Sequence, residues 1–179
     1  MVYLFLADGF EEIEALATVD ILRRCELDVK TVSITDERNV CGTHNIEVFA
    51  DITFQEIKED EIDALVLPGG LPGADNLENF KPLCDLLVKK ADEGKVIAAI
   101  CAAPKVLGVL GLLSGVKATC YPGFEAKLVR AIVKHKDVVA DKNFITAKGA
   151  GVTHEFASEI ASALGKSINA RRTLKAMFY

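Results

Sequence analysis

Val96-Ile97-Ala98-Ala99-Ile100 is an uninterrupted apolar run, and Cys101-Ala102-Ala103-Pro104 follows it directly. An apolar run of this length that contains β-branched residues predicts a buried strand. Proline is tolerated in the first turn of a helix, so Pro104 predicts that a helix begins just after the strand. Cys101 is therefore expected on a sharp strand-to-helix turn at the carboxyl end of a sheet.

The rest of the chain repeats this alternation of apolar strands and helices. Strands are expected at Val2–Ala7, Val29–Ile34, Ala64–Leu67, Val96–Ile100 and Phe144–Ala147. Helices are expected at Glu12–Cys25, Leu83–Glu93, Ala103–Leu110, Glu125–Val133, His154–Leu164 and Ser167–Met177, and His44–Ala50 is expected to form a hairpin or an edge strand. Such alternation predicts an α/β fold in which a mainly parallel sheet lies between two layers of helices.

Length and charge narrow the function classes. With 179 residues, the chain is expected to form one domain, residues 1–179, around one well-buried core. The net charge is −5 and the sequence has no basic stripe, so we expect no nucleic-acid partner. The apolar stretch 96–113 is interrupted by Pro104 and Lys105, and a strand followed by a buried helix explains it better than a membrane span.

The terminus and the cysteines point to a cellular compartment. Residues 1–7 are apolar but lack a basic leader and run into acidic residues, so we expect no signal peptide. The five cysteines are widely spaced and contain no C-x-x-C pair, which argues against a disulfide framework and against a zinc site. We therefore expect reduced thiols, no bound metal and a cytoplasmic location.

Cys101 has two interpretations. Most free cysteines are small buried hydrophobic residues. On a strand-to-helix turn, however, the helix amino terminus and unpaired N–H groups would favour the thiolate, which predicts a pKa below the free value of about 8.5.

The Gly69-Gly70 pair follows the apolar run Ala64–Leu67 and could bring a backbone N–H group close to an anion. It lacks the spacing of a dinucleotide site or a P-loop, so no nucleotide cofactor is expected.

Three glutamates open the first helix, where the helix dipole favours acidic residues. Two of them, Glu11 and Glu14, lie one turn apart on the same face, whereas Glu12 points elsewhere. A carboxylate beside a thiolate would be disfavoured, so a glutamate that partners Cys101 would have to be protonated and donate to the sulfur. Such a group could also serve as a general acid.

Four segments, taken in order, resemble the ThiJ/PfpI family. They are Ala7-Asp8-Gly9-Phe10-Glu11-Glu12-Ile13-Glu14, Val66-Leu67-Pro68-Gly69-Gly70, Ala99-Ile100-Cys101-Ala102-Ala103-Pro104 and Thr146-Ala147-Lys148-Gly149-Ala150-Gly151. The resemblance covers nearly the whole chain and is strongest to the branch that contains the parkinsonism-associated protein deglycase. It implies a flavodoxin-like α/β sandwich that forms a homodimer.

The resemblance also implies roles for individual residues. Cys101 would be the nucleophile, Glu14 the protonated carboxyl that touches its sulfur, and the N–H groups of Gly70 and Ala102 the oxyanion donors. Tyr121 stands where the deglycase has a histidine near the sulfur, and Ala102 stands where the protease-like branch has a histidine, so no Cys-His dyad is expected. Arg24 and His44 match positions that border the pocket or the dimer interface.

Two functions are compatible with this reading. The first is a cofactor-free enzyme of the glyoxalase or deglycase type, in which the Cys101 thiolate adds to a small reactive aldehyde or its adduct. The second is a redox-responsive stress protein or chaperone in which Cys101 is oxidised to a sulfinate that accepts a hydrogen bond from Glu14. Turnover distinguishes the two, because a sensor modifies its cysteine stoichiometrically.

Overall fold

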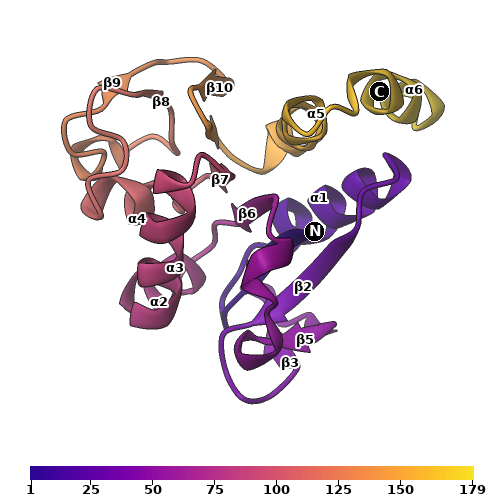
Figure 1. Ribbon diagram of the computed structural model, residues 1–179, viewed down its shortest axis with the longest axis horizontal. Coiled ribbons are helices and arrows are strands. Elements are labelled where there is room, and N and C mark those ends of the chain that lie inside the picture. The colour runs from indigo at the N-terminus through magenta and orange to yellow at the C-terminus, as the bar shows by residue number, and fades with distance from the viewer.

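A seven-stranded sheet forms the centre of the molecule in the computed structural model, which describes all residues 1–179 (Figure 1). Its strands run in the order β10-β11-β7-β6-β1-β2-β5, and every neighbouring pair is parallel except β10 and β11. The strands are β1 (Val2–Leu6), β2 (Val29–Ser33), β5 (Ile52–Thr53), β6 (Ala64–Leu67), β7 (Val96–Ile100), β10 (Val138–Asp141) and β11 (Phe144–Ala147). The five strands predicted from apolar runs are therefore confirmed, and they form the middle of the sheet.

Helices cover both faces of the sheet, which confirms the predicted α/β sandwich. Helices α1 (Glu12–Arg24), α5 (Thr153–Ala163) and α6 (Ser167–Ala176) lie on one face, and α2 (Gly73–Asn79), α3 (Lys81–Asp92) and α4 (Pro104–Val109) lie on the other (Figure 1). Along β1 and the residue that follows it, Val2, Leu4 and Leu6 pack towards α1 and α5, whereas Tyr3, Phe5 and Ala7 pack towards α3 and α4. The alternation of side chains along a strand thus gives each helix layer its own core.

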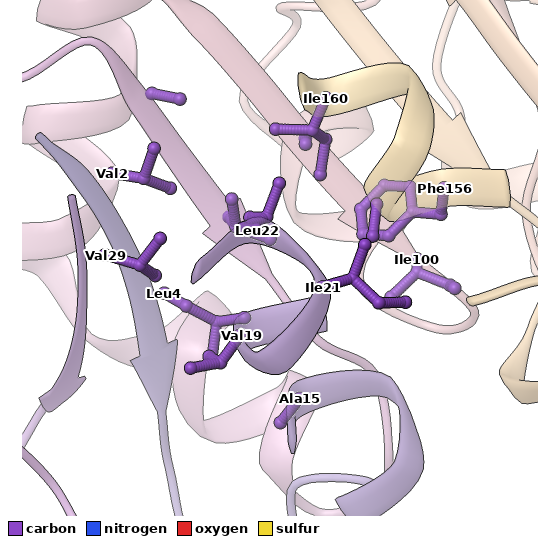
Figure 2. Packing of buried hydrophobic residues seen from close by; sticks show 14 of the residues in the cluster. Val2, Leu4, Ala15, Val19, Ile21, Leu22, Val29, Ile100, Phe156 and Ile160 are labelled. Carbon is purple, nitrogen blue, oxygen red and sulfur yellow. The ribbon is translucent and has the colours of Figure 1, made fainter. Parts of the chain in front are cut away.

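The core between α1 and α5 fixes the start of α1 above the sheet. Figure 2 shows Val19 and Leu22 of α1 beside Leu4 and Val2, and Ile21 of α1 beside Phe156 of α5. Burying a side chain such as Phe156 stabilises the fold by about 2–3 kcal/mol. This packing holds α1 in place, so that its first turn lies at the carboxyl end of β1.

Two small sheets complete the fold. Strands β3 (Asn39–Cys41) and β4 (Glu47–Phe49) form an antiparallel hairpin, which confirms the hairpin expected around His44–Ala50. Strands β8 (Lys117–Ala118) and β9 (Ile132–Val133) pair in parallel. No helix in the molecule is long and apolar enough to cross a membrane.

The helix predicted for Glu125–Val133 is wrong. Only Glu125–Lys127 forms a short 3-10 turn there, and Ile132–Val133 is strand β9. Arg130 has φ of 59°, a left-handed conformation that ends any helix, and the N–H of Ile132 bonds instead to the carbonyl of Val116. The helical spacing of apolar residues in this segment reflects packing against α4 and β8 and not a helix.

Candidate active site

Cys101 lies on a strained elbow at the carboxyl end of β7. Its φ is 64°, a conformation that costs a non-glycine residue of the order of 1–3 kcal/mol. Two hydrogen bonds hold it, because its N–H donates to the carbonyl of Ala147 at 2.9 Å and its carbonyl accepts from the N–H of Tyr121 at 2.8 Å. The side chain is partly exposed. The elbow thus fixes the sulfur between the end of the sheet and the start of α4, as the sequence predicted.

Glu14 approaches the sulfur from α1. The N–H of Gly69 donates to its Oε2 at 2.8 Å, and Oε1 is buried without a hydrogen-bond partner of normal geometry. Cys101 is nevertheless close enough that its thiol and this carboxyl shift one another's pKa. Only 1% of Glu14 is exposed to solvent. Glu14 is therefore a buried carboxyl that faces Cys101, whereas Cys101 itself is partly exposed.

Gly69 allows this contact. A Cβ atom on Gly69 would lie 2.7 Å from Cβ of Cys101 and 2.7 Å from Oε2 of Glu14, closer than real Cβ atoms come. Any other residue at position 69 would push the two side chains apart. The sequence suggested that the Gly69-Gly70 pair permits close backbone approach, but the steric role of Gly69 itself depends on a contact between three separate segments and was missed.

The thiol and the carboxyl perturb each other's pKa. Burial raises the pKa of Glu14 from 4.5 to about 7, against the hydrogen bond from Gly69. Burial, followed by the charge of Glu14, raises the pKa of the Cys101 thiol to about 12. The N–H groups of Ala102 and Gly70 face the sulfur and oppose this rise. The structure therefore brings together four residues to which the family resemblance gives roles, namely Cys101, Glu14, Gly70 and Ala102.

The prediction that the pKa of the Cys101 thiol is lowered is wrong. The helix amino terminus and the two N–H groups are outweighed by burial and by the neighbouring carboxylate. Such a pair titrates as a unit. Below about pH 7 both groups hold protons, and above it they share a single one. The thiolate with a protonated Glu14 and the thiol with an ionised Glu14 carry the same charge, so their ratio does not depend on pH.

Burial of Glu14 also makes stability depend on pH. Because its folded pKa is raised, the contribution of Glu14 to stability is fully present below pH 4.5 and is lost as the pH rises through about 7. Relative to Glu14→Gln, whose amide cannot ionise, we expect the wild type to lose about 2–3 kcal/mol of unfolding free energy between pH 5 and pH 8. Urea unfolding of both proteins at the two pH values measures this. An equal difference at both would contradict it.

The other two glutamates of this turn have structural partners. Oε2 of Glu11 accepts the N–H of Glu14 at 2.7 Å and caps α1. Both oxygens of Glu12 bind His44, one through its backbone N–H at 2.6 Å and the other through Nδ1 at 2.7 Å. Ligand atoms of Glu11, Glu12 and His44 lie within 4.8 Å of one another, a spacing that could admit a cation. These hydrogen bonds already account for the arrangement, and His44 contacts Glu12 and not Cys101.

Arg24 does not line the pocket at Cys101. It ends α1, ten residues after Glu14 and thus about 15 Å further along the helix. Its guanidinium pairs with Asp20 at 2.8 Å and borders a small hollow beside Asn169 and Arg172 of α6. The length of α1 therefore separates Arg24 from Cys101, and a place for Arg24 at the dimer interface stays a prediction.

Tyr121 lies next to the elbow. Its backbone is bonded to Cys101, and its ring lies against Gly149, where a Cβ atom would come within 3.4 Å of Cδ2. A hollow of about 460 Å³ lies between Tyr121, Pro122 and the segment Lys148–Val152. This hollow is large enough for a small organic molecule. Tyr121 therefore lines a hollow next to the elbow, and its place near the sulfur stays a prediction.

Comparison with known proteins places the chain in a family. The family model described as "DJ-1/PfpI family" matches residues 1–163. Deglycase PfpI of Pyrococcus furiosus is 33% identical over 167 residues, which are 92% of this chain and 99% of that protein. Protein DJ-1 homolog B of Arabidopsis thaliana is 39% identical over 161 residues, 89% of this chain, but the chain spans only 37% of that relative.

The solved structures agree. The structure described as "Toxoplasma gondii DJ-1, oxidized" superposes with a TM-score of 0.94 at 32% identity and covers 99% of this chain and 97% of that one. Family model, sequence relatives and fold therefore lead to the same assignment. The chain belongs to the DJ-1/PfpI family.

Proposed function

We propose that this protein is a cysteine-dependent enzyme of the deglycase or glyoxalase type that converts small reactive aldehydes or their adducts. The observation that carries the proposal is the buried Glu14 carboxyl facing Cys101, with a pKa raised to about 7. A general base works best when its pKa lies near the working pH. Relatives named deglycases, including the Pyrococcus protein, favour the same class.

The first step is addition of the sulfur to the aldehyde carbon. Ionised Glu14 takes the thiol proton as Sγ of Cys101 forms its bond to that carbon. The aldehyde oxygen becomes an oxyanion, which the N–H groups of Gly70 and Ala102 are placed to stabilise. Protonation of that oxygen gives a hemithioacetal on Cys101.

A proton transfer then completes the conversion. With methylglyoxal, Glu14 moves the proton from the former aldehyde carbon to the neighbouring carbon through an enediol. The aldehyde carbon is thereby oxidised to a thioester and the ketone is reduced to an alcohol. Water hydrolyses the thioester to lactate and restores the thiol. The reaction therefore consumes only methylglyoxal and water.

A steady-state assay of lactate formation from methylglyoxal tests this proposal. We expect the wild type, dialysed against a chelator, to form many equivalents of lactate and Cys101→Ser to form none above the uncatalysed rate. Cys41→Ser is a matched control, because this cysteine is also partly exposed but lies in β3. Equal rates in the wild type and Cys101→Ser would overturn the proposal.

A redox role for the same cysteine is the second candidate. It is favoured by the partial exposure of Cys101 and by the relative whose structure is described as oxidised. Peroxide would convert the thiol through a sulfenic acid to a sulfinate, which a protonated Glu14 could hold by a hydrogen bond. A wild type that shows no turnover but is converted cleanly to the sulfinate would support this function over the enzyme.

We further propose a homodimer that forms through α1. Two apolar side chains of this helix, Ile13 and Leu16, face solvent, and 55% of Ile13 is exposed. We expect sedimentation at micromolar concentration to show a dimer that Ile13→Glu dissociates. Ile168→Glu, an equally polar change at an exposed isoleucine of α6, should leave it intact. A monomeric wild type would contradict the proposal.

We also propose a cytoplasmic location. All five cysteines are free, which fits a cytoplasmic location, where thiols stay reduced.

A further inference from the structure

Lys105 is a buried charge that the proposed chemistry does not use. Only 7% of its side chain is exposed, although it lies in the first turn of α4, four residues after Cys101. Its Nζ bonds to Oδ1 of Asp75 and lies 3.0 Å from Oε2 of Glu78, which is an ion pair without aligned hydrogen-bond geometry. Both carboxylates belong to α2. One ammonium group therefore joins two helices that are distant in sequence.

Burying such a group costs free energy, and stability alone does not explain it. Apolar residues of similar volume often replace a buried ion pair without loss of stability. Burial lowers the pKa of Lys105, but the hydrogen bond to Asp75 and the charges of Asp75 and Glu78 outweigh this effect and raise it overall. The ammonium group is thus charged at neutral pH and is held at one place between the helices.

Each of the two helices is preceded by one of the donors that face the sulfur. Gly70 precedes α2, and its carbonyl accepts the N–H of Ala74 at 2.9 Å. Ala102 precedes α4, and its carbonyl accepts the N–H of Lys105 at 3.3 Å. Movement of α2 relative to α4 would therefore carry the N–H of Gly70 away from that of Ala102.

We propose that Lys105 is a positioning residue that holds the N–H groups of Gly70 and Ala102 at a fixed separation around the Cys101 sulfur. The inference rests on the proposed function only in so far as this positioning would speed turnover of an aldehyde. Its effect on the reactivity of Cys101 can be measured without any substrate.

The test is the rate at which iodoacetamide alkylates Cys101 at pH 7.5, measured by mass spectrometry of the peptide that contains it. We expect Lys105→Met to lower this rate at least tenfold, because a displaced Gly70 no longer stabilises developing charge on sulfur. Lys105→Arg, which keeps the charge, should restore the rate to within about threefold of the wild type.

Lys90 provides a matched control. It is another buried lysine, with 5% of its side chain exposed, and its Nζ bonds to Glu93 at 2.8 Å. It lies near the end of α3, where its carbonyl accepts the N–H of Lys95 just before β7, at the opposite end of the sheet from Cys101. We expect Lys90→Met to lower the melting temperature as Lys105→Met does, but to leave the alkylation rate unchanged.

Asp75→Asn covers the case in which Lys105→Met does not fold, because Asp75 is half-exposed and its loss leaves Glu78 in place. We expect it to slow alkylation two- to fivefold. Wild-type rates in Asp75→Asn and in any folded Lys105→Met would overturn the inference, as would equal slowing in Lys90→Met. If Lys105→Met slows alkylation while the wild type shows no turnover of aldehydes, the inference stands and only the proposed function fails.

Discussion

Glu14→Gln is expected to lower the turnover of methylglyoxal by a factor of about 10²–10⁴, the usual contribution of a positioned general base. Glutamine keeps the shape of the side chain and can still accept the hydrogen bond from Gly69, which is 2.8 Å long in the wild type. It cannot take the proton of Cys101. The loss should therefore appear in kcat, with a folded protein and little change in KM.

The matched control for this variant is Glu11→Gln. Glu11 lies in the same turn and caps α1, but its carboxylate accepts the N–H of Glu14 and does not face the sulfur. We expect this change to cost some stability and to lower turnover less than tenfold. Wild-type turnover in Glu14→Gln would show that the base lies elsewhere.

Gly69→Ala is expected to have the second large effect. The added methyl group would overlap Cβ of Cys101 and Oε2 of Glu14, each at 2.7 Å, and would come within 3.0 Å of the carbonyl oxygen of Ile100. Since the elbow fixes Cys101, Glu14 must move away. We expect turnover to fall by more than 10² and the free energy of unfolding to fall by about 1–3 kcal/mol, the usual cost of overpacking.

Gly108→Ala separates the two consequences of overpacking. A Cβ atom there would lie 2.2 Å from the carbonyl oxygen of Lys127, so this variant also strains a close contact, but at the end of α4 away from Glu14. Thermal unfolding and alkylation of Cys101 are measured for both variants. Both variants should have a lower melting temperature than the wild type, and only Gly69→Ala should slow the alkylation of Cys101. Full activity in Gly69→Ala would contradict the tight packing of the site.

The central fold could be predicted from sequence because its strands are buried on both faces. Runs such as Val2–Leu6 and Val96–Ile100 are apolar throughout, and their period and length admit few alternatives. The edge strand Ile52–Thr53 was missed, because two residues carry no periodicity. Helix α2 was missed as well, since its sequence GADNLEN begins with glycine and carries no apolar stripe.

The residues of the site could be predicted from the sequence, but their pKa values could not. The elbow at Cys101 follows from a strand that meets a proline-led helix, and a helical face together with a family resemblance identifies Glu14. The thiol pKa depends on how deeply Glu14 and Cys101 are buried together, which no local pattern encodes. The buried ion pair of Lys105 could not be predicted for the same reason, because its partners lie about thirty residues earlier in the chain.

The central claim is that Cys101 and Glu14 act as one titrating pair, and alkylation across pH tests it most directly. Wild-type protein is treated with limiting iodoacetamide between pH 5 and pH 10, and each cysteine-containing peptide is quantified. We predict that the alkylation rate at Cys101 rises to a plateau with a midpoint near pH 7, where the pair loses its first proton. A midpoint at or above the free-cysteine value of about 8.5 would contradict this account.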